Sequence, residues 1–369
     1  MRQTLRTLQI AFTYIGTIVG AGFATGREIL QFFTQYGHWA TLTIILSTGV
    51  FIWLGTKMMI LARRIGAESY EDFNCHLFGK NTGGIISLFT LLILVGVNSI
   101  MLAGAGAMFE EHLGLHYQTG LLVTLVGSYL LLRRGIAGIL QMNSVVVPLM
   151  LSLSLIIIFN TIDHPEARHF ISLVTERSAF SAWMSPFLYT AFNLGMAQAV
   201  LVPMARHTQD DRTLTYGGII GGLGIGFMLM AAHFAMSAHM PGILKFEIPM
   251  ASIALSLGTV VQFVYMLLIF LEIFSTFVAD IYGVTLQLAQ RLPISRSVIT
   301  AAVMLTCYVF SQFGFSNLLG LFYPMFGALS LVWAVRLIVT PMVPPGKPGA
   351  FEKTTATPAP KTVPRSTRK

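Results

Sequence analysis

Long apolar segments separated by short polar connections dominate the chain. We expect ten membrane-spanning helices, because about 20 apolar residues in a helix cross the hydrocarbon core of a bilayer. The predicted spans are residues 8–33, 39–62, 83–108, 117–133, 136–160, 182–205, 214–238, 258–288, 297–313 and 315–340. None of these runs shows the alternation typical of strands, so the pattern predicts an all-α polytopic membrane protein.

The composition agrees with a membrane protein. The chain has 369 residues, of which 54% are hydrophobic and 10% are charged. A soluble domain carries about 25% charged residues, so the composition excludes an ordinary globular protein. The first residues imitate a secretory signal peptide, with a basic start, an apolar run and small residues up to Ala24. Because apolar spans continue to residue 340, we expect this segment to be retained as the first span.

Positive charge predicts the orientation, because the cytoplasmic connections of membrane proteins carry an excess of Lys and Arg. With the N-terminus inside, the inside connections hold Arg2, Arg6, Arg63, Arg64, Lys80, Arg133, Arg134, Arg206, Arg212, Arg291 and Arg296. The outside connections hold Arg168, Arg177 and Lys245. An even number of spans then returns the C-terminus to the cytoplasm. This asymmetry and a basic tail explain the net charge of +8 without a nucleic-acid partner.

The connections and the tail differ from the spans. Residues 1–340 are predicted to form the transmembrane domain, and residues 341–369 a disordered basic tail rich in Pro, Thr, Lys and Arg. Residues 68–78 favour a short amphipathic helix on the inner membrane surface, and residues 239–258 a helical hairpin or plug on the outer side. Cys75 and Cys307 match no metal or redox spacing, so we read both as free thiols.

The first span carries an interruption at residues 16–28, GTIVGAGFATGRE. Four glycines (Gly16, Gly20, Gly22 and Gly26) precede the charged pair Arg27 and Glu28. Glycine lowers helix propensity, so the backbone can leave the helix here. Inside a membrane such a break is tolerated only where the freed N–H and C=O groups face protein or a polar cavity. The segment therefore predicts a binding site at mid-membrane.

The sixth span has a comparable segment, Phe192–Gln198, between Pro186 and Pro203. Five spans separate it from the first, so the two halves of the chain would face opposite ways in the membrane. Paired breaks of this kind indicate an inverted-repeat transporter, with repeats at about residues 8–160 and 182–340. The alternative is that these glycines only allow close helix packing, and for Gly195 alone the two interpretations are equally supported.

The segment GTIVGAGF resembles the first helix of the amino acid–polyamine–organocation superfamily, the transporters with the LeuT fold. The longer run AFTYIGTIVGAGFATGREILQFF is similar to the YkvI-like family of bacterial membrane proteins. The resemblance extends over the ten spans by count and topology. It implies two inverted five-helix repeats, broken first and sixth helices, and a location in the bacterial inner membrane with both termini cytoplasmic.

The resemblance also implies a set of site residues. The backbone N–H groups of Gly20, Ala21 and Gly22 would bind a substrate carboxylate, and the matching segment of the sixth helix would be Phe192, Asn193, Leu194 and Gly195. A sodium site would use carbonyl groups of Gly16 and Val19 with the hydroxyls of Ser275 and Thr276. Phe23 stands where some relatives have an amide for a second sodium site, so that site is not expected. Arg27 is one residue off the register of an arginine that relatives use in an outer gate.

Polar groups at mid-depth add further candidates. Glu272 lies three and four residues before Ser275 and Thr276, so the three share a helix face. Its carboxyl group would join cation binding or carry a coupling proton, or it is a structural, protonated glutamate. Arg27 and Glu28 either pair with outer residues to close the site or neutralise each other.

Several further residues are less specific. Phe23 and Phe192 would contact an apolar substrate side chain. Polar groups that would line the cavity, or else bond between helices, are Asn98, Ser99, Asn143, Ser144, Tyr189, Asn193 and Gln198. We interpret Asp280 as a helix-end or inner-gate charge and His233 as a packed, hydrogen-bonded histidine.

These observations predict a secondary active transporter of a small polar solute, an amino acid or related carboxylate, coupled to Na⁺ or H⁺. The alternative is a nutrient sensor with the same fold that binds the solute without transporting it. No metal-ligand cluster, catalytic triad or phosphate-binding loop occurs in the sequence, so we expect no enzyme and no cofactor apart from Na⁺ as a coupling ion. The partners expected are the solute and the lipid bilayer; the sequence does not define an oligomeric state.

Overall fold

The computed structural model describes residues 2–246, 249–256, 258–312 and 329–344. The expected tail from residue 345 onward, and the part of the tenth predicted span before residue 329, lie outside the described residues. The helices are α1 (Arg2–Ile18), α2 (Ala21–Ala24), α3 (Arg27–Phe32), η1 (Thr34–Tyr36), α4 (Trp39–Val50), η2 (Phe51–Gly55), α5 (Thr56–Ile65), α6 (Tyr70–Phe78), α7 (Lys80–Leu113), α8 (Tyr117–Leu132), α9 (Ile136–Ile162), η3 (Pro165–His169), α10 (Ala179–Arg206), α11 (Asp211–Ser237), η4 (Gly242–Lys245), α12 (Pro249–Ser256), α13 (Thr259–Arg291) and α14 (Arg296–Ser311). A further apolar helix covers Leu329–Val339.

All the regular secondary structure of the described residues is helical, as expected for this membrane protein. Within it, six helical segments are long and apolar enough to cross a bilayer. They are Trp39–Ile65, Lys80–Glu110, Ile136–Ile162, Ala179–Arg206, Asp211–Ser237 and Val260–Arg291. Three shorter apolar helices, Tyr117–Leu132, Arg296–Ser311 and Leu329–Val339, fall in predicted spans. The prediction of an all-α polytopic membrane protein is therefore confirmed.

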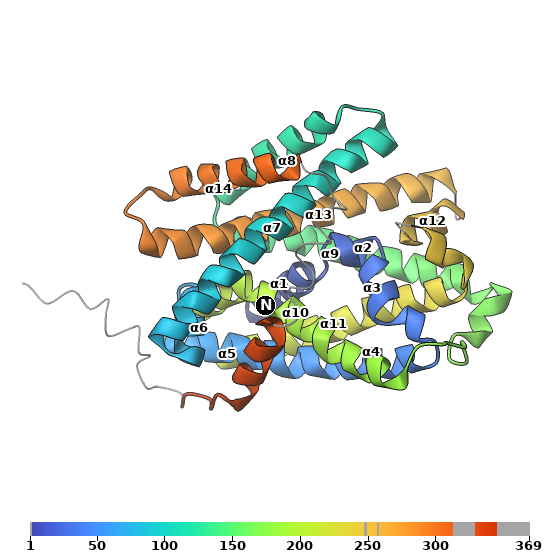
Figure 1. Cartoon of the computed structure of the whole chain (residues 1–369), viewed down its shortest axis with the longest axis horizontal. Helices are drawn as coiled ribbons and strands as arrows, with labels where there is room; N and C mark the ends of the chain where they lie inside the picture. The colour runs from blue at the N-terminus through green and yellow to red at the C-terminus, as the bar shows by residue number, and fades with distance from the viewer. Residues whose placement is uncertain (1, 247–248, 257, 313–328, 345–369) are drawn as a thin grey trace, which may run out of the picture.

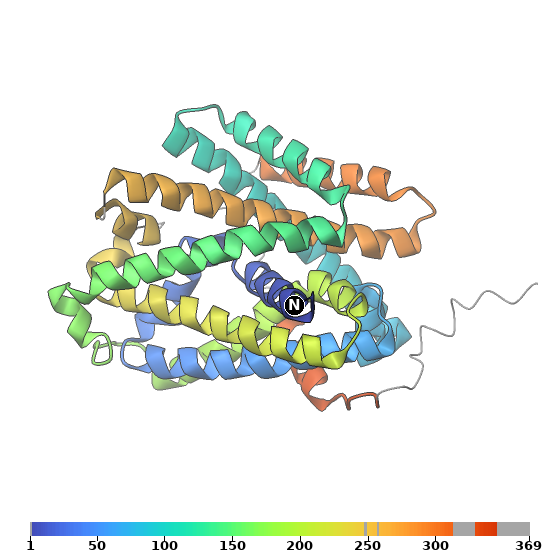
Figure 2. The same ribbon diagram turned by 180° about the vertical axis from the view of Figure 1, so that it is seen from behind.

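The helices divide into two packed groups (Figures 1 and 2). The upper group consists of α7, α8, α13 and α14, each of which packs against the other three. In the lower group, α1 packs against α10 and α11, which in turn pack against α4 and α5. Helices α1 and α2 both contact α13, so the break between them lies where the two groups meet.

The first predicted span is interrupted, as the glycine pattern predicts. Helix α1 ends at Ile18, α2 begins at Ala21, and α3 begins at Arg27. Gly26, between α2 and α3, has φ of 82°, a left-handed conformation that residues with a side chain rarely adopt. Three helical pieces therefore cross the region where a plain membrane helix would be continuous.

The predicted break in the sixth span is wrong. Helix α10 is continuous from Ala179 to Arg206, across Asn193 and Gly195. A single glycine costs a helix only about 1 kcal/mol, and packing against neighbouring helices compensates that cost. A methyl group at Gly195 would lie 3.3 Å from Ser330 Oγ, so Gly195 allows a close approach to the helix Leu329–Val339. The packing interpretation of this glycine is the correct one.

Both unusual connections contain helix. Residues 70–78 form α6, whose N-terminus has a capping box: Ser69 accepts from the backbone N–H of Asp72, and the Asp72 carboxylate accepts from Ser69 N. Tyr70, Phe73 and Leu77 of α6 are buried, so the helix packs on the protein through one face. In the other connection, η4 and α12 occur in the predicted outer hairpin. Met250 N at its α12 end donates to Thr25 O beside the break, over 3.1 Å.

Candidate functional site

The break between α1 and α2 leaves backbone groups without helical partners. The last four carbonyl groups of a helix and the first N–H groups of the next lack intrahelical partners. At the end of α1, Val19 N donates to Ile15 O over 2.8 Å and Gly20 N donates to Ile18 O over 3.0 Å. Of those last four carbonyl groups, these bonds leave the carbonyls of Gly16 and Thr17 for other partners. The N–H groups at the start of α2 include that of Gly22.

Gly20 lies directly against α13. A methyl group at Gly20 would lie 3.6 Å from Thr276 Oγ1 and 3.9 Å from Met101 Cε. The Thr276 side chain is 5% exposed, and its hydroxyl oxygen is buried without a hydrogen-bond partner in the described part of the chain. The structure therefore brings together Gly20 and Thr276, two residues that the sequence analysis placed in adjoining substrate and sodium sites.

The carboxyl group of Glu272 lies one turn before Thr276 on α13. Its side chain is fully buried, and both carboxyl oxygens lack a hydrogen-bond partner among the described residues. Ser275 uses its hydroxyl to donate to the carbonyl oxygen of Glu272 over 3.0 Å. A buried charge in a membrane is costly, so this carboxyl group requires a proton or a bound cation to neutralise it, whether its role is in coupling or structural.

Two hydrogen bonds hold the outer side of the break: one comes from α13, and the other lies within residues 22–25. Tyr265, seven residues before Glu272 on the same face of α13, donates its hydroxyl to Ala24 O. Thr25 Oγ1 donates to Gly22 O over 3.1 Å. These bonds satisfy carbonyl groups that the short helix α2 leaves without partners.

Arg27 and Glu28 have different environments. Glu28 is 8% exposed, and its carboxyl group occupies the space where a side chain at Gly22 would lie. Arg27 is exposed and donates to Phe246 O over 3.3 Å. Arg27 therefore has a partner in the outer connection.

A contact that the sequence analysis did not predict joins Gly16 to α9. A methyl group at Gly16 would lie 2.3 Å from Asn143 Oδ1, which is itself buried without a hydrogen-bond partner in the described residues. Asn143 was recognised as a polar residue of the fifth span, but helical periodicity gives the face of a residue and not its partner. The carbonyl end of α1 therefore has an amide oxygen beside it.

Some predicted site residues are directed elsewhere. Asn193 Nδ2 donates to Tyr189 O over 2.9 Å, and Gln198 Nε2 donates to Gly195 O over 2.7 Å, so both amides bond within α10. Asn98 likewise donates to Leu94 O over 2.7 Å within α7, which leaves its Oδ1 buried and without a partner among the described residues.

A small apolar cavity lies on the outer side of the break. Phe23 and Ala24 line it together with Tyr265. The remaining lining residues come mainly from α9 and α11, with Met250 from α12, and are Met150, Leu153, Ser154, Ile157, Met228, Ala231 and Ala232. Phe23 thus faces the space in which an apolar group could lie, whereas Phe192 does not line this cavity.

His233 is a packed histidine, as expected. Its Nδ1 lies 3.1 Å from Thr34 Oγ1 and its Nε2 lies 3.4 Å from Thr41 Oγ1. Both ring nitrogens therefore have partners, and the histidine joins α11 to the segment after α3.

Comparison with known proteins gives the family. The membrane protein YkvI of Bacillus subtilis (strain 168) is 40% identical to this chain over 330 residues, which cover 89% of this chain and 94% of YkvI. This chain belongs to the YkvI family. The protein YyaD of the same organism is 23% identical over 329 residues, covering 89% of this chain and 95% of YyaD. No protein-family model matches the chain.

Solved structures give the fold. MhsT in complex with L-phenylalanine has a TM-score of 0.69 at 15% identity, covering 89% of this chain and 87% of MhsT. A Na⁺-coupled sialic acid symporter has a TM-score of 0.66 at 13% identity, covering 90% and 79% of the two chains. The manganese transporter of Eremococcus coleocola has a TM-score of 0.61 at 12% identity, covering 91% and 79%. The YkvI family member described here therefore has the LeuT fold of secondary transporters.

Proposed function

We propose that this chain is a secondary active transporter of an amino acid or a related small carboxylate. It would have ten membrane-spanning helices in two inverted five-helix repeats, at about residues 8–160 and 182–340. It would lie in a bacterial inner membrane with both termini in the cytoplasm. The orientation follows from the basic connections, and four of their arginines (Arg63, Arg64, Arg206 and Arg291) form ion pairs with Asp211, Glu68 and Glu71.

One observation carries this proposal: a broken helix faces buried oxygen atoms that have no partner. Gly20 at the break packs on Thr276, and Thr276 Oγ1 and both oxygens of Glu272 are unpartnered in the described residues. Unpartnered buried polar atoms cost about 1–3 kcal/mol each, so a protein retains them where a ligand uses them. An inert packing site would be expected to have lost them.

The proposed substrate follows from the backbone groups of the break. The N–H groups at the start of α2 (Ala21, Gly22) are suited to an anionic carboxylate, because helix N-termini attract negative charge. The cavity beside Phe23 and Tyr265 would take the apolar part of the same molecule. The structural neighbours bound to L-phenylalanine and to sialic acid carry ligands of this class.

Two coupling ions fit the same region. Na⁺ prefers hard oxygen ligands, which the carbonyl groups of Gly16 and Val19 and the hydroxyls of Ser275 and Thr276 would supply. A proton would instead be carried by Glu272, whose carboxyl group lies on the same face of α13. Asn143 Oδ1 beside Gly16 would add an oxygen to the sodium site.

Alternating access would follow from movement of the lower group of helices against the upper group. The break at residues 19–20 and the left-handed Gly26 would provide the hinges, since α2 between them packs against α13 of the upper group. Because α10 is continuous, the hinge of the second repeat would not be at Gly195.

A thermal-unfolding experiment tests the site. The detergent-purified protein is heated with single amino acids or small organic acids, in NaCl and in KCl, because a ligand that binds only the folded state raises the melting temperature. Thr276→Val should abolish a Na⁺-dependent rise. Thr306→Val is the matched control, since Thr306 is exposed on α14 and its hydroxyl donates to Ala302 O of the same helix.

Flux then separates a carrier from a sensor. If ligands bind but labelled ligand does not cross a proteoliposome membrane, the transporter proposal fails and the sensor alternative stands. A ligand shift that depends on pH and on Glu272, with no effect of Na⁺, would assign the coupling to protons.

A further inference from the structure

The polar face of α13 continues past the site towards the Arg291 end of the helix. Spacings of seven, four, four and seven residues place five polar side chains on one face of α13. They are those of Tyr265, Glu272, Thr276, Asp280 and Gln287. Asp280 is 2% exposed, and its Oδ2 is buried without a hydrogen-bond partner in the described part of the chain. The proposed transport site makes no use of this second acid.

Helices α6, α10 and α14 pack against α13. The titratable groups that they bring towards Asp280 are Tyr70 of α6 and Cys307 of α14, both uncharged at neutral pH. On the α10 side, Ala199 meets Gly283 of α13. The other carboxyl group on this face is that of Glu272. No Arg, Lys or His among the described residues forms an ion pair with Asp280.

A second unpartnered group lies at the same depth on α7. Met101 of α7 and Thr276 of α13 both touch the position of Gly20. The two helices are antiparallel, since Arg291 Nη2 donates to Gly84 O over 3.4 Å. Asn98 precedes Met101 by three residues, and Asp280 follows Thr276 by four. Both therefore lie one helical turn closer to the contact between Gly84 and Arg291. Asn98 Oδ1, like Asp280 Oδ2, is buried and unpartnered in the described residues.

These two groups complement each other when the acid carries a proton. A protonated carboxyl group is a hydrogen-bond donor, and an amide oxygen is an acceptor. An isolated carboxylate in a dry site would be far more costly than the neutral acid. The buried position of Asp280 therefore suits the acid with a proton bound.

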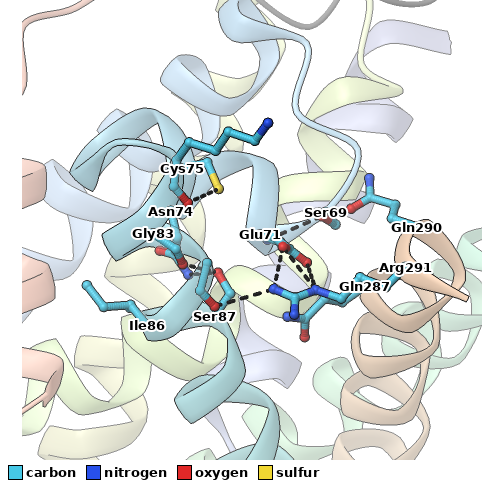
Figure 3. Close-up of polar contacts among 12 residues, drawn as sticks. Ser69, Glu71, Asn74, Cys75, Gly83, Ile86, Ser87, Gln287, Gln290 and Arg291 are labelled. Carbon is cyan, nitrogen blue, oxygen red and sulfur yellow. Dashed lines mark hydrogen bonds and ion pairs between the residues drawn. The ribbon is translucent and has the colours of Figure 1, made fainter.

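Helix α6 covers the end of this polar face, between Asp280 and Arg291. Tyr70 donates its hydroxyl to Gln287 Oε1, and Ser69 Oγ donates to Gln290 Oε1 over 2.6 Å. Figure 3 shows the Arg291 guanidinium bonded to the Glu71 carboxylate at the same end of α13, an ion pair of 2.5 Å. Separation of α6 from α13 would break these contacts and uncover the polar face.

We propose that Asp280 is an inner proton-binding site, which releases its proton to the cytoplasm when α6 separates from α13 and binds one when α6 returns. In the release step the carboxyl O–H bond breaks, the proton passes to cytoplasmic water, and a carboxylate remains. The site is distinct from Glu272. Its role in coupling, though not its proton binding, rests on the proposed transport function.

Trp333 provides a reporter for this movement. Its Nε1 donates to Asn74 Oδ1 of α6 over 3.0 Å, and its ring packs against Phe73 with centroids 6.4 Å apart. A variant that keeps Trp333 as its sole tryptophan (Trp39→Phe, Trp53→Phe, Trp183→Phe) is placed in lipid nanodiscs. Its fluorescence is titrated from about pH 5 to about pH 9. Because His76 also lies on α6, the titration is done in a His76→Gln background.

We expect a one-proton fluorescence transition that persists in Glu272→Gln and is lost in Asp280→Asn. Asp280→Asn should hold the low-pH signal, because asparagine is neutral like the protonated acid. Asp280→Glu should keep the transition at a shifted midpoint, which separates loss of the acid from loss of fold. Absence of any transition in the parent, or an unchanged transition in Asp280→Asn, would overturn the proposal.

The transport proposal fails independently of this test. If solute exchange is absent but the Asp280-dependent transition is present, transport is wrong and the proton site stands. If exchange occurs and Asp280→Asn leaves its proton dependence unchanged, the assigned coupling role is wrong.

Discussion

Tyr265 of α13 donates its hydroxyl to the carbonyl oxygen of Ala24, the last residue of the short helix α2. This bond crosses from the upper group of helices to the interrupted first span, on the outer side of the break. It occurs where Phe23 and Ala24 line the apolar cavity. The outer end of the proposed site is thus held by one side chain of the helix that also carries Glu272 and Thr276.

Tyr265→Phe should weaken the attachment of α2 to α13. The change leaves Ala24 O buried without its donor, at a cost of about 1–3 kcal/mol. We expect a lower melting temperature in detergent and faster hydrogen exchange at residues 21–26. Tyr216→Phe is the control, because Tyr216 is 61% exposed. Equal exchange in the two variants would contradict a role of the bond in closing the outer side.

Gly16 and Asn143 should behave as a coupled pair. A methyl group at Gly16 meets Asn143 Oδ1 at 2.3 Å, so Gly16→Ala should destabilise the protein by about 1–3 kcal/mol through overpacking. Adding Asn143→Ala makes room and should recover much of the lost melting temperature. If the double variant loses the sum of the two single effects, the contact between α1 and α9 is not as described.

Gly195 should tolerate a side chain, because α10 is continuous there. In a Ser330→Ala background, which removes the 3.3 Å contact, Gly195→Ala should raise stability by up to about 1 kcal/mol through helix propensity. Solute exchange should be retained. A stable variant that has lost exchange would show that this position must unwind during transport.

Asp210 should confer an acid-sensitive contribution to stability at the start of α11. The backbone N–H of Thr213 donates to its Oδ1 over 2.6 Å and holds the pKa of the carboxyl group below its usual range. The stabilisation is therefore present above the unfolded-state pKa of about 3.9 and is lost as the pH falls through the lower folded-state value.

The corresponding substitution tests this helix cap. Asp210→Ala should cost about 1 kcal/mol at neutral pH, whereas Asp210→Asn, which can also accept from Thr213 N, should cost less. Melting temperatures at neutral and acidic pH measure both effects. An Asp210→Ala variant that keeps the full acid dependence of the parent would refute the assignment to this carboxyl group.

The helices and the break in the first span could be predicted from the sequence because their causes are local. Apolar length specifies a spanning helix, and clustered glycines from Gly16 to Gly26 specify a weak point in it. Helix α6 was recognisable for the same reason, since Ser69 and Asp72 form a capping box at its start.

The contacts between helices that are distant in the sequence could not be predicted in the same way. Gly195 and Gly20 both lie in segments predicted to be broken, but Gly195 packs on Ser330 within a continuous helix and Gly20 packs on Thr276 at a break. The contact of Gly16 with Asn143 joins residues 127 positions apart, and hydropathy does not encode such pairs. Helical periodicity placed Glu272, Ser275 and Thr276 near one another, but which hydroxyl remains unpartnered depends on packing.

The most direct test of the account is solute exchange in proteoliposomes. Vesicles loaded with unlabelled amino acids are diluted into a tritiated amino-acid mixture without an ion gradient, and trapped label is counted for the parent, Thr276→Val and Thr306→Val. We expect the parent and Thr306→Val to accumulate the label. Thr276→Val should not accumulate it, even though its melting temperature equals or exceeds that of the parent. Two results would contradict the proposed function. In one, vesicles with the parent trap no more label than vesicles without protein; in the other, Thr276→Val exchanges as much label as the parent.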